Sequence, residues 1–111
     1  PPRRPRHEGS GEAVGAVGFH DLRRGHRADI GYWLGEKYWG QGIMTEAVKL
    51  MTKYGFEKLK LQRIQGHVFS YNKSSKRVLE KCGYKLEGFL KKYSQSHGRI
   101  LDDYVLAKIK K

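Results

Sequence analysis

The hydrophobic period of this chain changes from that of a strand to that of a helix at Ile43, and two glycines mark the change. Before it, apolar side chains in residues 28–34 alternate with others, namely Ile30, Tyr32 and Leu34 against Asp29, Gly31 and Trp33. After it, they recur along one helical face, at Ile43, Ala47, Leu50, Met51 and Tyr54. Gly40 and Gly42 stand between the two patterns. The sequence therefore predicts a strand that passes through a glycine loop directly into a helix.

The remaining segments extend this unit to an α/β domain with a mixed sheet. Strand composition marks four further segments: residues 12–19, 61–70, 84–91 and 99–109, with a polar turn at residues 20–27. A second helix follows Asn72, a good N-cap, with an inner face of Ser75, Val78, Leu79 and Cys82. Gly83 directly follows, where a left-handed C-cap belongs. The predicted order is β-β-α-β-α-β-β, and its central strand–helix–strand requires a parallel pair with a right-handed crossover.

Length and composition limit the class of protein. The chain has 111 residues, enough for one domain at residues 12–111. Residues 1–11 are rich in Pro, Arg and Gly, and we expect a disordered basic start or remnant. A single cysteine, Cys82, excludes an internal disulfide and any cysteine-rich zinc site, and we expect its side chain in the core. No apolar run reaches membrane-spanning length, so we expect no membrane partner and a reducing, cytoplasmic location.

The chain is strongly basic, with 23 Lys and Arg against 11 Asp and Glu and a formal charge of +12. The surplus suggests an acidic partner, which could be nucleic acid, an acidic protein or a phosphorylated ligand, and the alternative is a basic surface that is only solvated. The five histidines have no metal-ligand spacing, and we interpret them as surface or hydrogen-bonded residues.

The loop around Gly40 and Gly42 has the composition of an anion site. Glycines permit positive φ and a close approach to backbone amides, and the first amides of a helix have no internal acceptors. The loop lacks the lysine and serine or threonine of a P-loop, and Thr45 stands where a dinucleotide motif needs a third glycine. A tight strand-to-helix turn without a ligand is the alternative.

Two blocks of the sequence resemble the GCN5-related N-acetyltransferase (GNAT) family, and more narrowly its branch of ribosomal-protein N-terminal (alanine) acetyltransferases. The first block is Asp29-Ile30-Gly31-Tyr32-Trp33-Leu34, followed by residues 38–47, Tyr-Trp-Gly-Gln-Gly-Ile-Met-Thr-Glu-Ala. The second comprises residues 72–75, 78–84 and 87–88, then Gly98 and Asp102-Asp103. The resemblance runs from about residue 12 to the end of the chain. The family's first strand and helices, which form much of the acceptor site, have no counterpart before residue 12, so we expect either a fragment or a minimal form.

The resemblance implies a GNAT-like acyl-CoA N-acyltransferase fold whose sheet opens after the strand ending near Leu34. Acetyl-CoA would bind in the opening without a metal, its pyrophosphate on the amides from Gln41 to Met44 and its pantetheine arm beside Trp33. The family usually has Gln or Arg where this chain has Lys37, which should matter little because backbone amides hold the phosphates. The implied cofactor-binding residues are Trp33, Leu34, Lys37, Gly40, Gln41, Gly42, Ile43, Met44, Asn72 and Ser75.

The same resemblance implies part of the catalytic apparatus. The backbone N–H of Leu34 would stabilise the oxyanion, and Ser75 would face the thiol. Leu79 stands where many relatives have a tyrosine acid, and Ser94 stands where the branch has a carboxylate base. The base is therefore open between Asp29, Glu36 and a chain of water molecules, with Asp29 favoured.

The sequence thus predicts an acetyl-CoA-dependent N-acetyltransferase, a monomer or homodimer, acting on a primary amine. A protein N-terminus of the ribosomal type fits the basic charge best, while a polyamine or an aminoglycoside stays possible as acceptor. The alternative from another class is a non-catalytic basic module that binds RNA or the ribosome. Such a module is compatible with the arginine-rich start and lysine-rich end, but the chain lacks an RNA-stacking motif.

Overall fold

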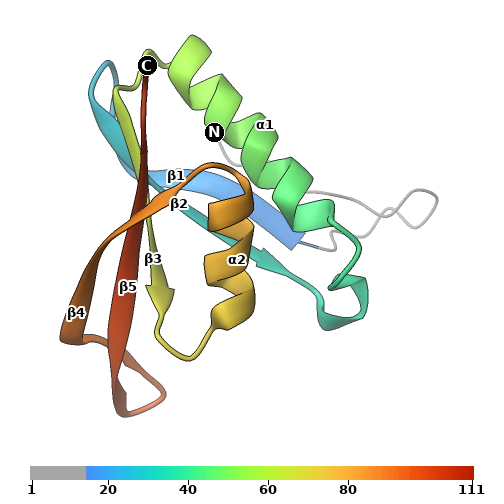
Figure 1. Ribbon diagram of the computed structural model, residues 1–111, viewed down its shortest axis with the longest axis vertical. Coiled ribbons are helices and arrows are strands. Elements are labelled where there is room, and N and C mark those ends of the chain that lie inside the picture. Colours follow the sequence, from blue (N-terminus) through green and yellow to red (C-terminus); the bar gives the residue numbers. More distant parts are fainter. Residues whose placement is uncertain (1–14) are drawn as a thin grey trace.

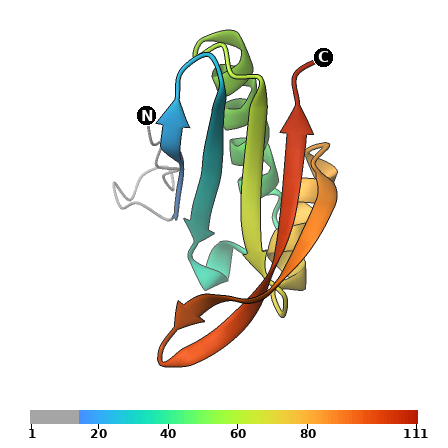
Figure 2. The same ribbon diagram turned by 90° about the vertical axis from the view of Figure 1, so that its left-hand side faces the viewer.

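The computed structural model describes residues 15–111, which form a five-stranded mixed sheet with two helices on one face (Figures 1 and 2). The expectation of a disordered basic start at residues 1–11 therefore lies outside the described residues. The elements are β1 (Gly15–Arg23), β2 (Arg27–Leu34), the 3-10 turn η1 (Glu36–Tyr38), α1 (Ile43–Glu57), β3 (Arg63–Phe69), α2 (Lys73–Lys81), β4 (Lys85–Ser96) and β5 (Arg99–Ile109). The predicted β-β-α-β-α-β-β order is confirmed.

The sheet has the order β1-β2-β3-β5-β4, in which β2 and β3 are parallel and all other neighbours antiparallel. The parallel pairing is short: only Arg27–Asp29 pairs with Arg63–Gln65. Beyond these residues β2 and β3 diverge, while β3 stays paired with β5 as far as Phe69 (Figure 2). The sheet is therefore open in its middle, at the carboxyl ends of two neighbouring strands.

Two strands are longer than the sequence predicted. β1 does not end at Phe19 but continues to Arg23, so the expected turn over residues 20–27 shrinks to residues 24–26. β4 continues beyond Lys91 to Ser96. In both cases the pairing register shifts within the added stretch, which breaks the alternation of apolar and polar residues. Pairing to a neighbouring strand, rather than burial of one face, holds these polar segments in the sheet.

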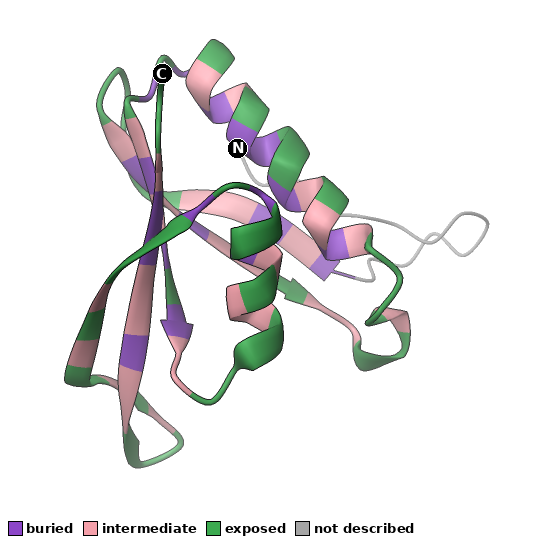
Figure 3. Cartoon of the chain, viewed as in Figure 1, coloured by how far each residue is buried: buried purple, intermediate pink, exposed green. Residues whose placement is uncertain are grey.

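The inner face of α1 is rotated relative to the predicted one. The buried residues are Met44, Val48, Met51, Thr52 and Gly55, and they face the sheet (Figure 3). Leu50, which the apolar spacing placed inside, is 59% exposed. Small residues decide the rotation: a Cβ on Gly55 would lie 2.8 Å from Phe19 Cζ, so glycine lets the helix pack closely on β1 and β3. α1 continues past Gly55 to Glu57.

The second helix follows the prediction closely. The side-chain oxygen of Asn72 accepts a hydrogen bond from the Ser75 amide at 3.0 Å, which is an N-cap. Gly83 follows the helix with φ of 90°. Cys82 is buried as expected, its thiol donates to the carbonyl oxygen of Thr45, and burial raises its pKa. Neither helix within residues 15–111 is long and apolar enough to cross a membrane.

Candidate active site

The gap between β2 and β3 contains a pocket of about 230 Å³. Residues from both faces of the sheet line it, so the pocket occupies the gap itself rather than one surface. On β2 they are consecutive residues, whose side chains alternate between the faces. The lining consists of His20, Asp29, Ile30, Gly31, Tyr32, Gly66, His67, Ser75 and Leu79. Two of the predicted catalytic residues, Asp29 and Ser75, thus lie at one pocket although they are far apart in sequence.

On the helix side of the pocket, Tyr32 bridges β2 to the first turn of α2. Its hydroxyl donates to the carbonyl oxygen of Ser75 at 3.0 Å and lies 2.8 Å from Ser75 Oγ, where either oxygen can donate. Burial raises the pKa of Tyr32 to about 12, although the hydrogen bond with Ser75 partly opposes the shift. Tyr32 is therefore neutral across the physiological range, and the pair presents uncharged hydroxyl groups to the pocket.

On the opposite face of the sheet, the pocket is lined by Asp29, His20 and His67. The imidazole of His20 lies directly against Gly31, since a Cβ at Gly31 would fall inside van der Waals contact with that ring. Among residues 15–111, no three His, Cys, Asp or Glu side chains are arranged to hold a metal ion. This side of the pocket is thus titratable but has no metal-binding group within the described residues.

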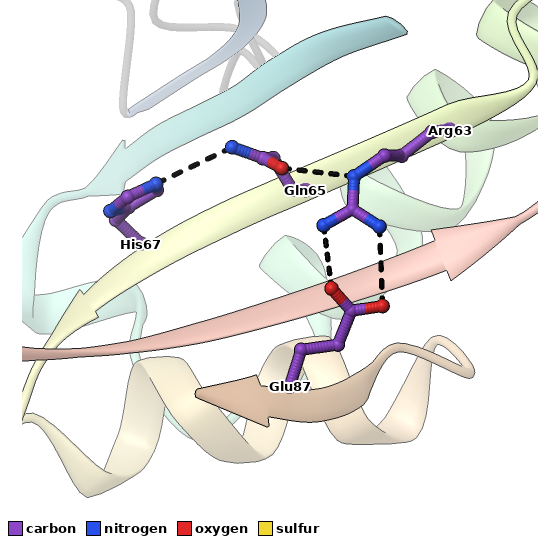
Figure 4. A network of polar contacts seen from close by, with 4 residues as sticks. All are labelled: Arg63, Gln65, His67 and Glu87. Carbon is purple, nitrogen blue, oxygen red and sulfur yellow. Dashed lines mark hydrogen bonds and ion pairs between the residues drawn. The ribbon is translucent and has the colours of Figure 1, made fainter. Parts of the chain in front are cut away.

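A polar network runs along β3 toward His67 (Figure 4). Arg63 donates to both carboxylate oxygens of Glu87, at 2.6 and 3.2 Å, and its Nε donates to Gln65 Oε1 at 3.0 Å. The side-chain nitrogen of Gln65 then lies 3.5 Å from His67 Nε2. The hydrogen bonds with Glu87 raise the pKa of Arg63 and lower that of Glu87. Both groups are therefore charged at neutral pH, and the network is anchored at one end by an ion pair.

Sequence reasoning missed this network and the buried Asp103 beside it. The signal was present: Arg63, Gln65 and His67 occur at every second residue of β3, where they alternate with the buried Ile64, Gly66 and Val68. In a central strand, a polar row of this kind indicates one face that is not packed by apolar residues. The roles of the individual residues could not be found in this way, because Glu87 and Asp103 come from other strands.

The glycine loop leads into α1 with the geometry of an anion site. Gly40 and Gly42 have φ of 77° and 76°, and Gly42 is the N-cap residue. The first amide to donate along the helix is that of Glu46, to the Gly42 carbonyl oxygen, so the helix itself supplies no acceptor to the amides of residues 43–45. Those amides carry the positive end of the helix dipole, which fits a phosphate group.

The other predicted cofactor residues surround this loop. The indole of Trp39 donates to the carbonyl oxygen of Leu34 at 2.8 Å, which ties the loop to the end of β2. Within the loop, the side chain of Gln41 donates to the backbone carbonyl oxygen of Lys37 at 3.2 Å. The Lys37 ammonium lies over the ring of Tyr38. Trp33 is 56% exposed, whereas the side chain of Met44 is buried and only its backbone can face a ligand. Trp33, Leu34 and Asn72 are not part of the pocket lining, and their roles remain predictions.

Comparison with known proteins identifies the family of the chain. Residues 4–85 match the family model described as "Acetyltransferase (GNAT) domain". The chain belongs to the GNAT family. An uncharacterized N-acetyltransferase p20 of Bacillus licheniformis is 37% identical over 101 residues, which cover 90% of this chain and 57% of that protein.

Two solved structures of acetyltransferases resemble the chain closely. A ribosomal-protein-S5-alanine acetyltransferase from Vibrio fischeri superposes with a TM-score of 0.85 at 32% identity, over 88% of this chain and 55% of that one. The microcin C7 self-immunity acetyltransferase MccE, in complex with acetyl-CoA and AMP, has a TM-score of 0.80 at 32% identity, over 89% and 56%. The chain thus spans little more than half the length of these relatives.

Proposed function

We propose that this GNAT protein transfers the acetyl group of acetyl-CoA to a primary amine, and that the amine is a protein N-terminus of the ribosomal type. The observation that carries the proposal is the divergence of β2 from β3 after three residue pairs, beside a helix that begins with free amides. The gap offers unpaired strand edges to an extended ligand, and the helix start offers amide donors to its phosphates. An acyl-CoA has both features.

Acetyl-CoA supplies a thioester, whose carbonyl carbon the amine attacks. The backbone amides from Gln41 to Met44 would hold its pyrophosphate, and the edge of β2 near Trp33 would hold the pantetheine arm. The Leu34 amide would stabilise the oxyanion. Because the Tyr32 hydroxyl already donates to the Ser75 carbonyl oxygen, the neutral Ser75 hydroxyl would be the donor to a leaving thiolate. Much of the acceleration would come from holding amine and thioester together.

Charge and similarity favour a protein acceptor over a small polycation. A chain with a formal charge of +12 attracts acidic surfaces and repels polyamines and aminoglycosides. The similarity to a ribosomal-protein-S5-alanine acetyltransferase supports the same class of acceptor. Among the described residues 15–111, Asp29 is the one carboxylate in the pocket lining, too little to recognise several ammonium groups at once.

The first experiment is calorimetric titration of the 111-residue chain with acetyl-CoA, followed by a mass-spectrometric screen for acetylated products among ribosomal-protein N-terminal peptides, polyamines and aminoglycosides. We expect saturable binding and acetylation of a peptide N-terminus. Acetylation of a polyamine instead would change the acceptor class and leave the acetyltransferase assignment intact. Absence of binding at millimolar acetyl-CoA, together with salt-sensitive RNA binding, would support the non-catalytic module.

A further inference from the structure

We propose that His67 is the general base that takes the proton from the acceptor amine, and that Asp103 and Gln65 hold its ring in the required tautomer. The proposal rests on the proposed function and supplies the base that the sequence left open. His67 lines the pocket from β3, and its side chain is 26% exposed, so the ring is accessible to an acceptor amine.

Asp103 is the first reason. It is 2% exposed on β5, and its Oδ2 accepts from Ser94 Oγ at 2.7 Å and lies 3.7 Å from His67 Nδ1. Its Oδ1 has no hydrogen-bond partner among residues 15–111. A carboxylate so buried and incompletely paired is costly, and a proton on the adjacent Nδ1 reduces that cost. Tyr93 stacks on the imidazole with ring centroids 5.4 Å apart and limits its rotation.

Gln65, on the other side of the ring, favours the same tautomer, with the proton on Nδ1. Because the Arg63 guanidinium donates to Gln65 Oε1, the amide nitrogen of Gln65 is the atom that faces His67 Nε2 (Figure 4). An amide NH₂ group can only donate, so Nε2 must carry the lone pair and Nδ1 the proton. The Glu87 ion pair fixes Arg63 and hence the orientation of the amide. A neutral imidazole with its lone pair at Nε2 is the form that a general base requires, and the acceptor amine must replace the Gln65 amide as the partner of that lone pair.

The proton balance of the step is complete with the substrates of the proposed reaction. The ammonium form of the acceptor gives one proton to His67 Nε2, and the freed nitrogen lone pair forms a bond to the thioester carbon. The C–S bond then breaks, and the second proton lost by the nitrogen passes to the leaving thiolate. His67 releases its proton to water, so one proton is produced for each amide formed.

Other ionisable groups lie around His67, and each is an alternative candidate for the general base. Asp29 and His20 line the same pocket from β2 and β1, yet the side chain of neither makes a hydrogen bond within residues 15–111 that would orient it. His67 has a polar neighbour at each ring nitrogen, the Gln65 amide 3.5 Å from Nε2 and the Asp103 carboxylate 3.7 Å from Nδ1. The groups that face it are Gln65 on β3, Asp103 on β5, Tyr93 on β4 and, across the pocket, Asp29 and His20.

The first arm of the test needs no acetyl-CoA. In the 111-residue chain labelled with ¹⁵N-histidine, long-range imidazole spectra of neutral His67 should show the proton on Nδ1, with His67→Gln giving the assignment. Asp103→Asn should reduce that preference. Gln65→Glu, on the surface of the sheet and close in shape, replaces a donor by an acceptor and should move the proton to Nε2 or keep the ring doubly protonated. A proton on Nε2 in the unaltered chain would overturn the positioning role.

The second arm is kinetic. His67→Gln should lower kcat/KM by roughly a hundredfold or more and remove the fall of kcat/KM at acidic pH, with acetyl-CoA affinity unchanged. His97→Gln, in the β4–β5 turn, is the matched control and should keep the unaltered rate. An unchanged rate in His67→Gln, or an acidic limb lost only in Asp29→Asn, would overturn the base assignment. If the unaltered chain neither binds nor turns over acetyl-CoA, the proposed function fails, and the tautomer spectra alone then decide how His67 is held.

Discussion

The phenolic oxygen of Tyr32 lies 2.8 Å from Ser75 Oγ, and this contact joins strand β2 to helix α2 across the pocket. The two residues are 43 positions apart in the sequence. Their hydroxyls close one side of the opening between β2 and β3, at the point where the strands no longer hydrogen-bond to each other. The contact therefore stabilises the open form of the sheet at a place where hydrogen bonds between β2 and β3 cannot contribute to stability.

Removing this contact should destabilise the fold modestly. Tyr32→Phe leaves the ring in place but deprives the Ser75 carbonyl and hydroxyl groups of their partner, at a cost of about 1–2 kcal/mol. Urea unfolding monitored by circular dichroism measures the change. Tyr71→Phe is the matched control, because Tyr71 is 67% exposed and its hydroxyl faces water, and we expect no change above 0.5 kcal/mol, roughly the scatter for surface substitutions. Equal effects in the two variants would contradict the role of the contact.

Tyr32 should also make stability depend on alkaline pH. Its pKa is raised from the model-peptide value of 10.0 to about 12 in the folded chain, so between these values the folded state retains a proton that the unfolded state has lost. Stability must then fall as pH rises through this window, by about 2 kcal/mol for this residue. Unfolding curves at several pH values should show a steeper fall for the unaltered chain than for Tyr32→Phe. Parallel curves would show that the tyrosine is not desolvated.

The glycine loop can be tested by a pair of variants that differ only in charge. Gly42 has φ of 76°, a conformation that Asn and Asp tolerate better than other residues, and both are good N-caps. Gly42→Asp places a negative charge where the pyrophosphate is proposed to bind, whereas Gly42→Asn does not. We expect Gly42→Asp to bind acetyl-CoA roughly ten- to a hundredfold more weakly than Gly42→Asn in calorimetric titration.

The stability of the two Gly42 variants provides the control. A carboxylate at the start of a helix stabilises it, so Gly42→Asp should unfold no more easily than Gly42→Asn. Weaker acetyl-CoA binding by Gly42→Asp would then result from repulsion between its carboxylate and the pyrophosphate, and not from a less stable helix. Equal affinities of the two variants would place the pyrophosphate elsewhere.

Truncation of two neighbouring residues on α1 should reduce the stability of the fold by very different amounts. Met51 is fully buried against the sheet and Leu50 is 59% exposed. Met51→Ala should cost about 2–5 kcal/mol, because it leaves a cavity in the core, while Leu50→Ala should stay within about 0.5 kcal/mol. Urea unfolding of both variants tests which face of the helix is internal. A large loss of stability in Leu50→Ala would show instead that the helix face predicted from the apolar spacing is internal.

Local patterns were sufficient to predict most of the elements of this protein. The strand alternation in residues 28–34, the Asn72 cap and the glycine at position 83 depend on near neighbours in the chain, and each is confirmed. Prediction failed where distant contacts outweigh local pattern. β1 and β4 extend because another strand pairs with them, and α1 is rotated because Gly55 admits the side chains of Phe19, Leu61 and Ile64.

In the candidate site, too, local features could be predicted from the sequence and contacts between distant residues could not. By itself, the sequence determined the glycine loop before α1, since φ values and free amides at a helix start are local properties of the backbone. It also carried the motifs of the GNAT family, which the comparisons confirm. Only the tertiary structure decided that Tyr32 meets Ser75 and that Asp103 lies behind His67, because each pair joins elements that are far apart in the sequence, β2 with α2 and β3 with β5. The hydrogen-bonded chain that orients His67 exists only once β3, β4 and β5 are side by side.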